Sequence, residues 1–94
     1  MRKTGSALLL CVLCAVGLSA QSAEELRRAT ALFQQGLKLQ EAGQCDAAIQ
    51  RYSDYIKIRP GRASVYYNRG LCYFRQLEVD KAIADLSKAI EIDS

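Results

Sequence analysis

Apolar and polar residues follow helical spacing over most of the chain after residue 22. Apolar or small side chains recur three or four positions apart in four segments, and none of these segments alternates strictly as a strand would. Gly43-Gln44 and Pro60-Gly61 interrupt the pattern, and proline lacks the amide that a helix interior needs. The spacing therefore predicts an all-α chain of four helices, near residues 23–42, 45–58, 62–76 and 79–92.

The second half of this pattern repeats the first half when residue 29 is aligned with residue 63 and the rest follows without gaps. Nine of the 32 aligned positions are identical in type. The identical pairs are Ala29/Ala63, Gly36/Gly70, Leu37/Leu71, Asp46/Asp80, Ala48/Ala82, Ile49/Ile83, Ser53/Ser87, Ile56/Ile90 and Ile58/Ile92. A helix-turn-helix unit with this period resembles the tetratricopeptide repeat, whose units are about 34 residues long.

The resemblance extends to the positions at which helices of this family pack together. Small residues on facing helices permit close approach of the two backbones. The family's structural positions are matched here by Gly36, Leu39, Ala48, Tyr52, Pro60, Gly70, Tyr73, Ala82, Leu86 and Ala89. The resemblance implies a right-handed superhelical stack of antiparallel helix hairpins. It places an N-terminal extension at residues 21–28, one repeat at 29–62 and a second at 63–94.

Some positions depart from the family pattern. Tyr55 stands where alanine is usual and three helices meet, so looser or shifted packing between the units is expected. Leu77 replaces the turn glycine, Leu32 replaces an aromatic residue, and Ser94 replaces the closing proline. An ordinary four-helix bundle is the alternative fold, but the register of glycine, alanine and proline favours the repeat.

Residues 1–20 have the layout of a cleavable secretory signal peptide. Arg2 and Lys3 precede an uncharged apolar stretch at 7–18, and small residues follow it. This stretch is shorter than the ~20 residues of a membrane-spanning helix, so an uncleaved anchor is the less favoured alternative. Cleavage is expected after Ala20, with Ser19 and Ala23 as the alternative positions. The mature chain is then expected in the periplasm or secreted, with a link to the membrane only through the targeting segment.

Charge and composition argue against several classes of function. Without the leader, eleven basic residues face ten acidic ones, and their scatter leaves no stripe for nucleic acid. The chain has no histidine and no glycine-rich phosphate loop, which removes the usual general bases and nucleophile pairs. The carboxylates of the second helices are interpreted as helix-start or solvent-facing groups: Asp46, Asp54, Asp80 and Asp85. We expect no enzyme, metal, cofactor or small-molecule substrate.

Cys45 and Cys72 are the two cysteines outside the leader. Antiparallel neighbouring helices would place the start of the second helix beside the later half of the third. An exported protein can keep a disulfide, and closing a loop of about 27 residues contributes ~3–4 kcal/mol. The alternative is a pair of small, buried free thiols.

The resemblance also implies a concave face, lined by the first helix of each unit, where a peptide or helix of a partner binds. The family's groove positions fall on Thr30, Phe33, Leu37, Gln40, Glu41, Arg62, Ser64, Tyr67, Asn68, Leu71, Phe74 and Arg75. This lining is largely aromatic and aliphatic, and exposed aromatic residues are typical anchors. Alternatively, Phe33, Tyr67 and Phe74 complete the core. Phe33 and Leu37 replace the polar pair with which some members clamp a terminal carboxylate, so we expect no clamp.

The fourth helix leaves Ile83, Leu86 and Ile90 on the side where a third unit would pack, although about three units are usual. The sequence thus predicts a non-enzymatic adaptor or scaffold that binds another protein in its groove. Two alternatives stay open: a structural subunit that self-associates as a homo-dimer through the last helix, or the N-terminal part of a longer repeat protein. A thiol-dependent redox protein or hydrolase is a third, less favoured possibility.

Overall fold

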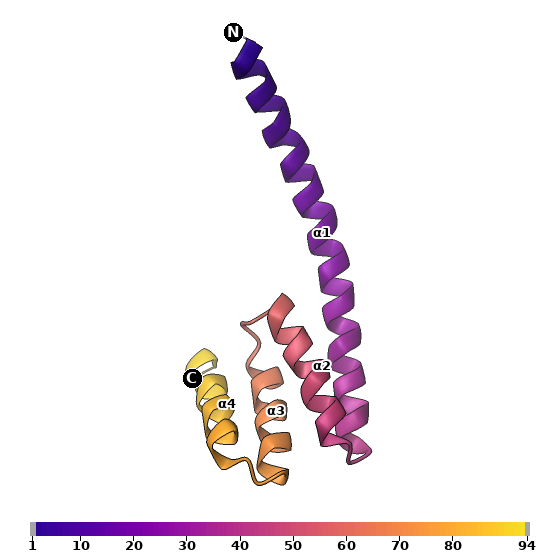
Figure 1. Ribbon diagram of the computed structural model, residues 1–94, viewed down its shortest axis with the longest axis vertical. Helices are drawn as coiled ribbons and strands as arrows, with labels where there is room; N and C mark the ends of the chain where they lie inside the picture. The colour runs from indigo at the N-terminus through magenta and orange to yellow at the C-terminus, as the bar shows by residue number, and fades with distance from the viewer. Residues whose placement is uncertain (1, 94) are drawn as a thin grey trace.

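The computed structural model describes the backbone of residues 2–93 and the side chains of residues 22–93. Its four helices are α1 (Arg2–Glu41), α2 (Cys45–Ile58), α3 (Ala63–Arg75) and α4 (Val79–Ile92) (Figure 1). No strand occurs over residues 2–93, so the all-α prediction is confirmed. The helix boundaries agree with the expected ones to within a residue, except that the expected start near residue 23 lies inside α1.

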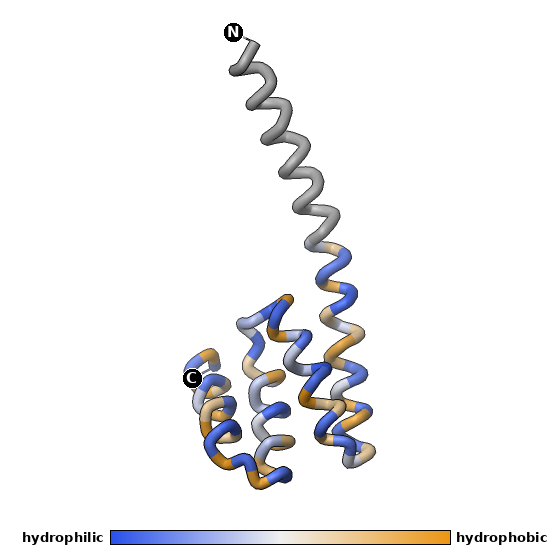
Figure 2. Tube along the Cα trace, viewed as in Figure 1, coloured by the Kyte–Doolittle hydropathy of each residue, from blue (hydrophilic) through white to orange (hydrophobic). Residues whose placement is uncertain are grey.

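The helices form two antiparallel hairpins stacked side by side. α1 packs against α2, α3 packs against α4, and α2 and α3 form the joint between the hairpins (Figure 1). Over residues 22–93 each helix carries both apolar and polar residues (Figure 2). Amphipathic helices of this kind bury one face against a neighbour, which explains why the chain stacks as hairpins.

Both hairpin turns have the same backbone conformation. The amide of Gln44 donates to the carbonyl of Leu39 at 2.8 Å, and Gly43 between them has a φ of 78°. In the second turn the amide of Glu78 donates to the carbonyl of Tyr73 at 2.9 Å, and Leu77 has a φ of 63°. This is the Schellman ending of a helix, in which the left-handed residue is usually glycine. Leu77 therefore replaces the turn glycine without changing the turn.

The core of the first hairpin is built around two buried tyrosines. A Cβ atom at Gly36 would overlap the ring of Tyr52, so only glycine lets α1 approach α2 this closely. The hydroxyl of Tyr52 donates to Oε1 of Gln40 at 2.5 Å. Tyr55 is fully buried at the joint, with its ring 5.9 Å from that of Phe33. The packing therefore accommodates the tyrosine that replaces the family's alanine.

The second hairpin uses smaller side chains at its centre. A Cβ at Gly70 would lie 3.1 Å from Cγ of Leu86, a tight but smaller conflict than at Gly36. The remaining structural positions fall as follows: Ala48, Ala82 and Ala89 are buried, Leu39, Tyr73 and Leu86 are half-buried, and Pro60 is exposed. The small residues that the repeat pattern singled out thus lie between the helices.

The signal peptide predicted over residues 1–20 lies outside the residues whose side chains are described. Among the residues that are described, none of the helices combines the length and apolar character needed to cross a membrane.

Candidate functional site

Three of the expected groove residues lie in one stripe along α3, and two of them are exposed. Tyr67, Leu71 and Phe74 are spaced by four and three residues, which places them on the same side of a helix. Tyr67 is 51% exposed and Phe74 60% exposed, whereas Leu71 is half-buried between them. We call these three residues the aromatic stripe. Large aromatic side chains held at the surface on a regular helix are suited to contact a partner.

The groove residues on α1 are less available. The ring of Phe33 lies 6.2 Å from that of Tyr52 and 5.9 Å from that of Tyr55. The guanidinium of Arg62 lies 4.5 Å from the centre of the Phe33 ring. Phe33 therefore completes the core of the first hairpin, as the alternative interpretation held, and Arg62 covers what is left of it. Leu37 is likewise half-buried.

Several polar groove residues already bond within the chain. The Thr30 hydroxyl donates to the carbonyl of Leu26 at 2.9 Å, and Nδ2 of Asn68 donates to the carbonyl of Ser64 at 2.8 Å. Gln40 accepts from Tyr52 as described above. Glu41 and Arg75 are exposed at the ends of α1 and α3. Tyr67 and Phe74 are therefore the exposed apolar members of the expected groove, beside exposed polar residues at its edges.

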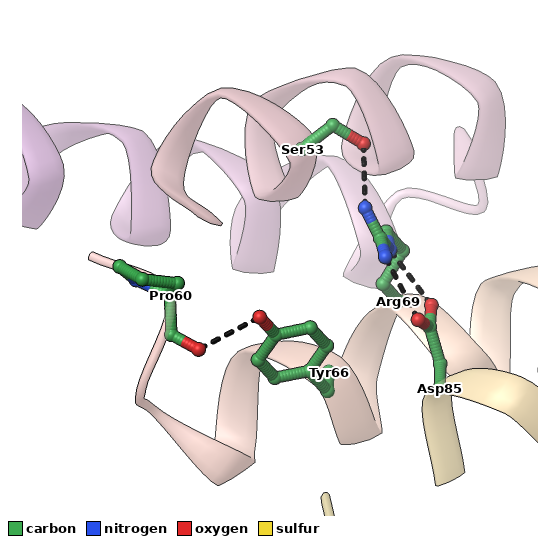
Figure 3. Close-up of polar contacts among 5 residues, drawn as sticks. All are labelled: Ser53, Pro60, Tyr66, Arg69 and Asp85. Carbon is green, nitrogen blue, oxygen red and sulfur yellow. Dashed lines mark hydrogen bonds and ion pairs between the residues drawn. The ribbon is translucent and has the colours of Figure 1, made fainter. Parts of the chain in front are cut away.

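An ion pair that sequence reasoning missed joins three of the helices. Arg69 on α3 donates from Nε to Oδ2 of Asp85 at 2.7 Å and from Nη2 to Oδ1 at 2.8 Å (Figure 3). Its Nη1 donates to Oγ of Ser53 on α2 at 3.0 Å. The expectation that Asp85 faces solvent is therefore wrong, because this carboxylate is buried on α4 and paired. The hydrogen bonds that Arg69 donates to Asp85 raise the pKa of Arg69, against the opposing effect of burial.

Aromatic residues of α3 hold this ion pair in place. The guanidinium carbon of Arg69 lies 5.8 Å from the ring centres of both Tyr66 and Tyr73. The hydroxyl of Tyr66 donates to the carbonyl of Pro60 at 2.7 Å, which fixes the start of α3 to the preceding turn (Figure 3). The repeat comparison held a signal for this arrangement, since Gln35 and Arg51 stand at the matching positions of the first unit. Glutamine and arginine at these positions cannot form the Arg69–Asp85 ion pair, so this contact is specific to the second unit.

The two cysteines lie beside each other in the joint between α2 and α3. Both are buried free thiols, and burial together with a hydrogen bond to Cys45 raises the pKa of Cys72 above its usual value. The antiparallel placement expected from the sequence is thus observed. Their pairing as a disulfide stays a prediction.

A hollow of about 470 Å³ opens between α3 and α4 beside the aromatic stripe. Tyr67 is part of its wall, and the others are Ala63, Ser64, Leu86, Ala89, Ile90 and Asp93. In the first hairpin, Tyr55 stands at the position that Ala89 holds here. The small side chain of Ala89 therefore leaves open the space that a tyrosine ring fills in the first hairpin.

Few of the described side chains are both polar and buried. Over residues 22–93 no three metal-binding side chains gather into a group that could hold an ion. The buried polar groups there, notably Arg69 and Asp85, are paired with each other and away from any hollow described above.

Comparison with known proteins decides the nature of the second hairpin. The family model for the tetratricopeptide repeat matches residues 63–94, which hold α3 and α4. The chain contains a tetratricopeptide repeat. The repeat thus covers the aromatic stripe and the hollow beside it.

The chain is also similar to several known proteins, two of which are named for this repeat. Tetratricopeptide repeat protein 36 of Homo sapiens is 37% identical over 68 residues, which are 72% of this chain and 36% of that protein. Its Mus musculus counterpart is 33% identical over 88 residues, or 82% of this chain and 47% of that protein. Serine/threonine-protein phosphatase 5 of Mus musculus is 38% identical over 68 residues, but these are only 14% of it. The chain thus spans less than half the length of these curated relatives.

Proposed function

We propose that the chain is a non-enzymatic protein-interaction module that binds a peptide or helix of another protein along the aromatic stripe. The observation that carries this proposal is the exposure of Tyr67 and Phe74 on one side of a rigid helix. Burying such large apolar surfaces is favourable, and rigid aromatic anchors lose little conformational freedom on binding. The tetratricopeptide repeat over residues 63–94 supports a role in protein–protein interaction.

Two further features complete the proposal. The α1–α2 hairpin is a second repeat of the same kind, which is supported by the nine identities between residues 29–60 and 63–94. The chain works in the periplasm or the secretory space, which is supported by the basic start and apolar stretch of residues 1–20. N-terminal sequencing of the protein from its native compartment tests the second point. A start at Gln21 supports export, and an intact Met1 in the cytoplasm contradicts it.

Binding along the stripe is tested by selecting ligands from a random peptide library displayed on phage, with the chain from residue 21 as bait. We expect apolar peptides with micromolar Kd values, and we expect Phe74→Ala to weaken each of them about tenfold or more. The control variant is Leu77→Gly, which also removes an exposed apolar side chain but lies in the turn beyond α3. Selected peptides that bind Phe74→Ala and Tyr67→Ala as tightly as the parent would overturn the proposal.

A further inference from the structure

The two cysteines meet where the first turn of α2 lies beside the last turn of α3 (Figure 1). Cys45 and Cys72 belong to the same core cluster, and a hydrogen bond joins their thiols. A neighbouring contact fixes the same register, because Nε2 of Gln76 donates to Oδ1 of Asp46. Asp46 directly follows Cys45, and Gln76 lies one turn beyond Cys72. The two thiols are thus held together by both helices.

A hollow of about 480 Å³ opens onto one of these cysteines. Its wall consists of residues 43–47 around the start of α2, together with Arg75 and Gln76 at the end of α3. Cys45 is part of this wall and is 8% exposed, whereas Cys72 is 0% exposed and lies behind it. A reagent that enters from solvent therefore meets Cys45 first.

The charges in the wall suit a small anionic disulfide. Arg75 is exposed there, and its guanidinium can pair with a carboxylate of a bound molecule. Asp46 is the one carboxylate of the wall, and it already accepts from Gln76. Positive charge beside a thiol also favours the thiolate, which is the form that attacks disulfides. Oxidised glutathione combines a disulfide bond with carboxylates and matches this chemistry.

We propose that Cys45 is a thiol-exchange site for low-molecular-weight anionic disulfides such as oxidised glutathione. Cys72 then converts the adduct into a reversible Cys45–Cys72 bond, which locks α2 to α3. The bond joins the two hairpins covalently through the helix that carries the aromatic stripe. The site lies in the joint and is independent of the function proposed above.

The reaction balances in two exchange steps. Cys45 loses its proton and attacks one sulfur of oxidised glutathione, so that a Cys45–glutathione bond forms and one glutathione leaves as a thiol with that proton. Cys72 then loses its proton and attacks the Cys45 sulfur, and the second glutathione leaves as a thiol. Two protein thiols are oxidised, and one disulfide is reduced to two thiols. An excess of reduced glutathione reverses both steps.

Burial makes Cys72 a poor nucleophile toward solvent but leaves it able to react with Cys45. Burial and the neighbouring Cys45 keep the pKa of Cys72 above its usual value, while the charge of Arg75 acts in the opposite direction. Little of this thiol is therefore ionised at neutral pH. The second step is intramolecular, however, and a group held in contact reacts as if at a far higher concentration than a solute.

The test uses the full chain carrying C11S and C14S, in which Cys45 and Cys72 are the remaining thiols. The reduced protein is treated with oxidised glutathione, quenched with N-ethylmaleimide at intervals, digested with trypsin without reductant and analysed by mass spectrometry. We expect a transient glutathione adduct on Cys45, followed by residues 39–51 linked to residues 70–75. A first adduct on Cys72, or a link that forms only in urea, would refute the proposal.

Matched alanine variants separate the two roles. Cys72→Ala is expected to retain the glutathione adduct on Cys45, because no second thiol removes it. In Cys45→Ala, modification of Cys72 is expected to be slower by about tenfold or more, because this thiol is buried. Both variants are checked for the parent's helical circular dichroism. Equal rates of modification in the two variants would contradict entry through Cys45.

The role of Arg75 is tested with two disulfides of different charge. Arg75→Gln is expected to slow the reaction with oxidised glutathione by about two- to fivefold, as loss of an exposed ion pair would. The reaction with hydroxyethyl disulfide, which has no carboxylate, should slow less. Equal slowing with both reagents would contradict recognition of the carboxylates.

The lock itself is measured by thermal unfolding of the oxidised and reduced protein. We expect oxidation to raise the melting temperature by about 10 °C or more, because the bond closes a loop of about 27 residues in the unfolded chain. Reduced glutathione should restore the lower value. An oxidised protein that melts at or below the temperature of the reduced one would show that the bond does not lock the joint.

Discussion

At the residue scale, two positions show how strongly the backbone geometry constrains side-chain choice. Gly36 lies against the ring of Tyr52, where there is no room for even one methyl group. At Leu77 space is not limiting, because the side chain is exposed, but the backbone has a conformation that favours glycine. Each position makes a separate prediction about stability.

Replacing Gly36 with alanine should destabilise the protein. The new methyl group must displace the buried Tyr52 ring, and overpacking of this kind costs about 1–3 kcal/mol, partly offset by ~1 kcal/mol of better helix propensity. We expect a net loss of up to about 2 kcal/mol in urea unfolding followed by circular dichroism. Gly61→Ala is the control, since a Cβ there meets nothing within 4 Å. A Gly36→Ala protein as stable as Gly61→Ala would contradict the close helix approach.

Replacing Leu77 with glycine should stabilise the protein. The leucine side chain is 83% exposed and makes little contact, while its φ of 63° is strained for any residue with a Cβ. We expect a gain of about 0.5–1 kcal/mol, which is the left-handed strain less the entropy that glycine adds to the unfolded chain. The reverse change in the first turn, Gly43→Ala, should lower stability by a similar amount, since Gly43 has a φ of 78°. Equal melting temperatures for all three proteins would argue against the left-handed turns.

At the scale of the helices, the Arg69–Asp85 pair determines how α3 and α4 fit together and how both meet α2. Both oxygens of the carboxylate are engaged, and the remaining guanidinium nitrogen reaches Ser53 across the joint. Such a pair specifies one register of the helices, because a shift of either helix by a turn would leave a charge buried alone.

Removing the charge of Asp85 should be costly. Asp85→Asn leaves Arg69 largely buried without its counter-charge, and losing one partner of such a pair costs about 3–5 kcal/mol when fully buried. Because the Arg69 side chain keeps 19% of its exposure, we expect about 2–3 kcal/mol from urea unfolding. Asp54→Asn is the matched control, since Asp54 pairs with Lys57 at 3.6 Å on the surface and should cost under about 0.5 kcal/mol. Similar losses for both variants would mean that the buried Arg69–Asp85 pair contributes no more to the free energy of unfolding than a surface pair does.

At the scale of the whole molecule, the first hairpin and the joint carry the buried ionisable groups that couple stability to pH. Burial raises the pKa of Tyr52 to about 12, and burial raises the pKa of the Cys72 thiol as well. The folded state therefore keeps both groups neutral at pH values where the unfolded chain has ionised them. Ionisation of these two groups in the unfolded chain therefore leaves the free energy of unfolding unchanged below about pH 9. It lowers that free energy as the pH rises further.

Alkaline pH should thus unfold the protein progressively. We expect the free energy of unfolding to be flat from pH 7 to 8.5 and to fall by about 1–2 kcal/mol between pH 9 and 10.5, measured in urea with a phosphine reductant. The ordinary thiol value of 9.0 sets the start of this fall, and tyrosine with its ordinary value of 10.0 extends it. In Cys72→Ala the decline should begin about one pH unit later. An unchanged profile in this variant would exclude Cys72 as the cause.

The sequence alone determined the helices, their turns and the close contact points, because these depend on local periodicity and on residues with special backbone properties. Spacing located all four helices, and the alignment of the two repeats picked out Gly36, Gly70, Ala48 and Ala82 as the sites of close packing. It also marked Leu77 as the residue in the glycine position of a turn. Such local features can be predicted without knowing how the helices pack.

Only the tertiary structure decided which side chains are free and which are paired. Periodicity places Phe33 and Phe74 on equivalent sides of two helices, but Phe33 is covered by Tyr55 and Arg62 while Phe74 is exposed. The charge of Asp85 suggested a surface position, yet the residue is buried, because Arg69 sixteen positions earlier lies beside it and pairs with it. The periodicity of one segment predicts which face of a helix is buried. The side chains that contact this face are determined by how separate segments pack.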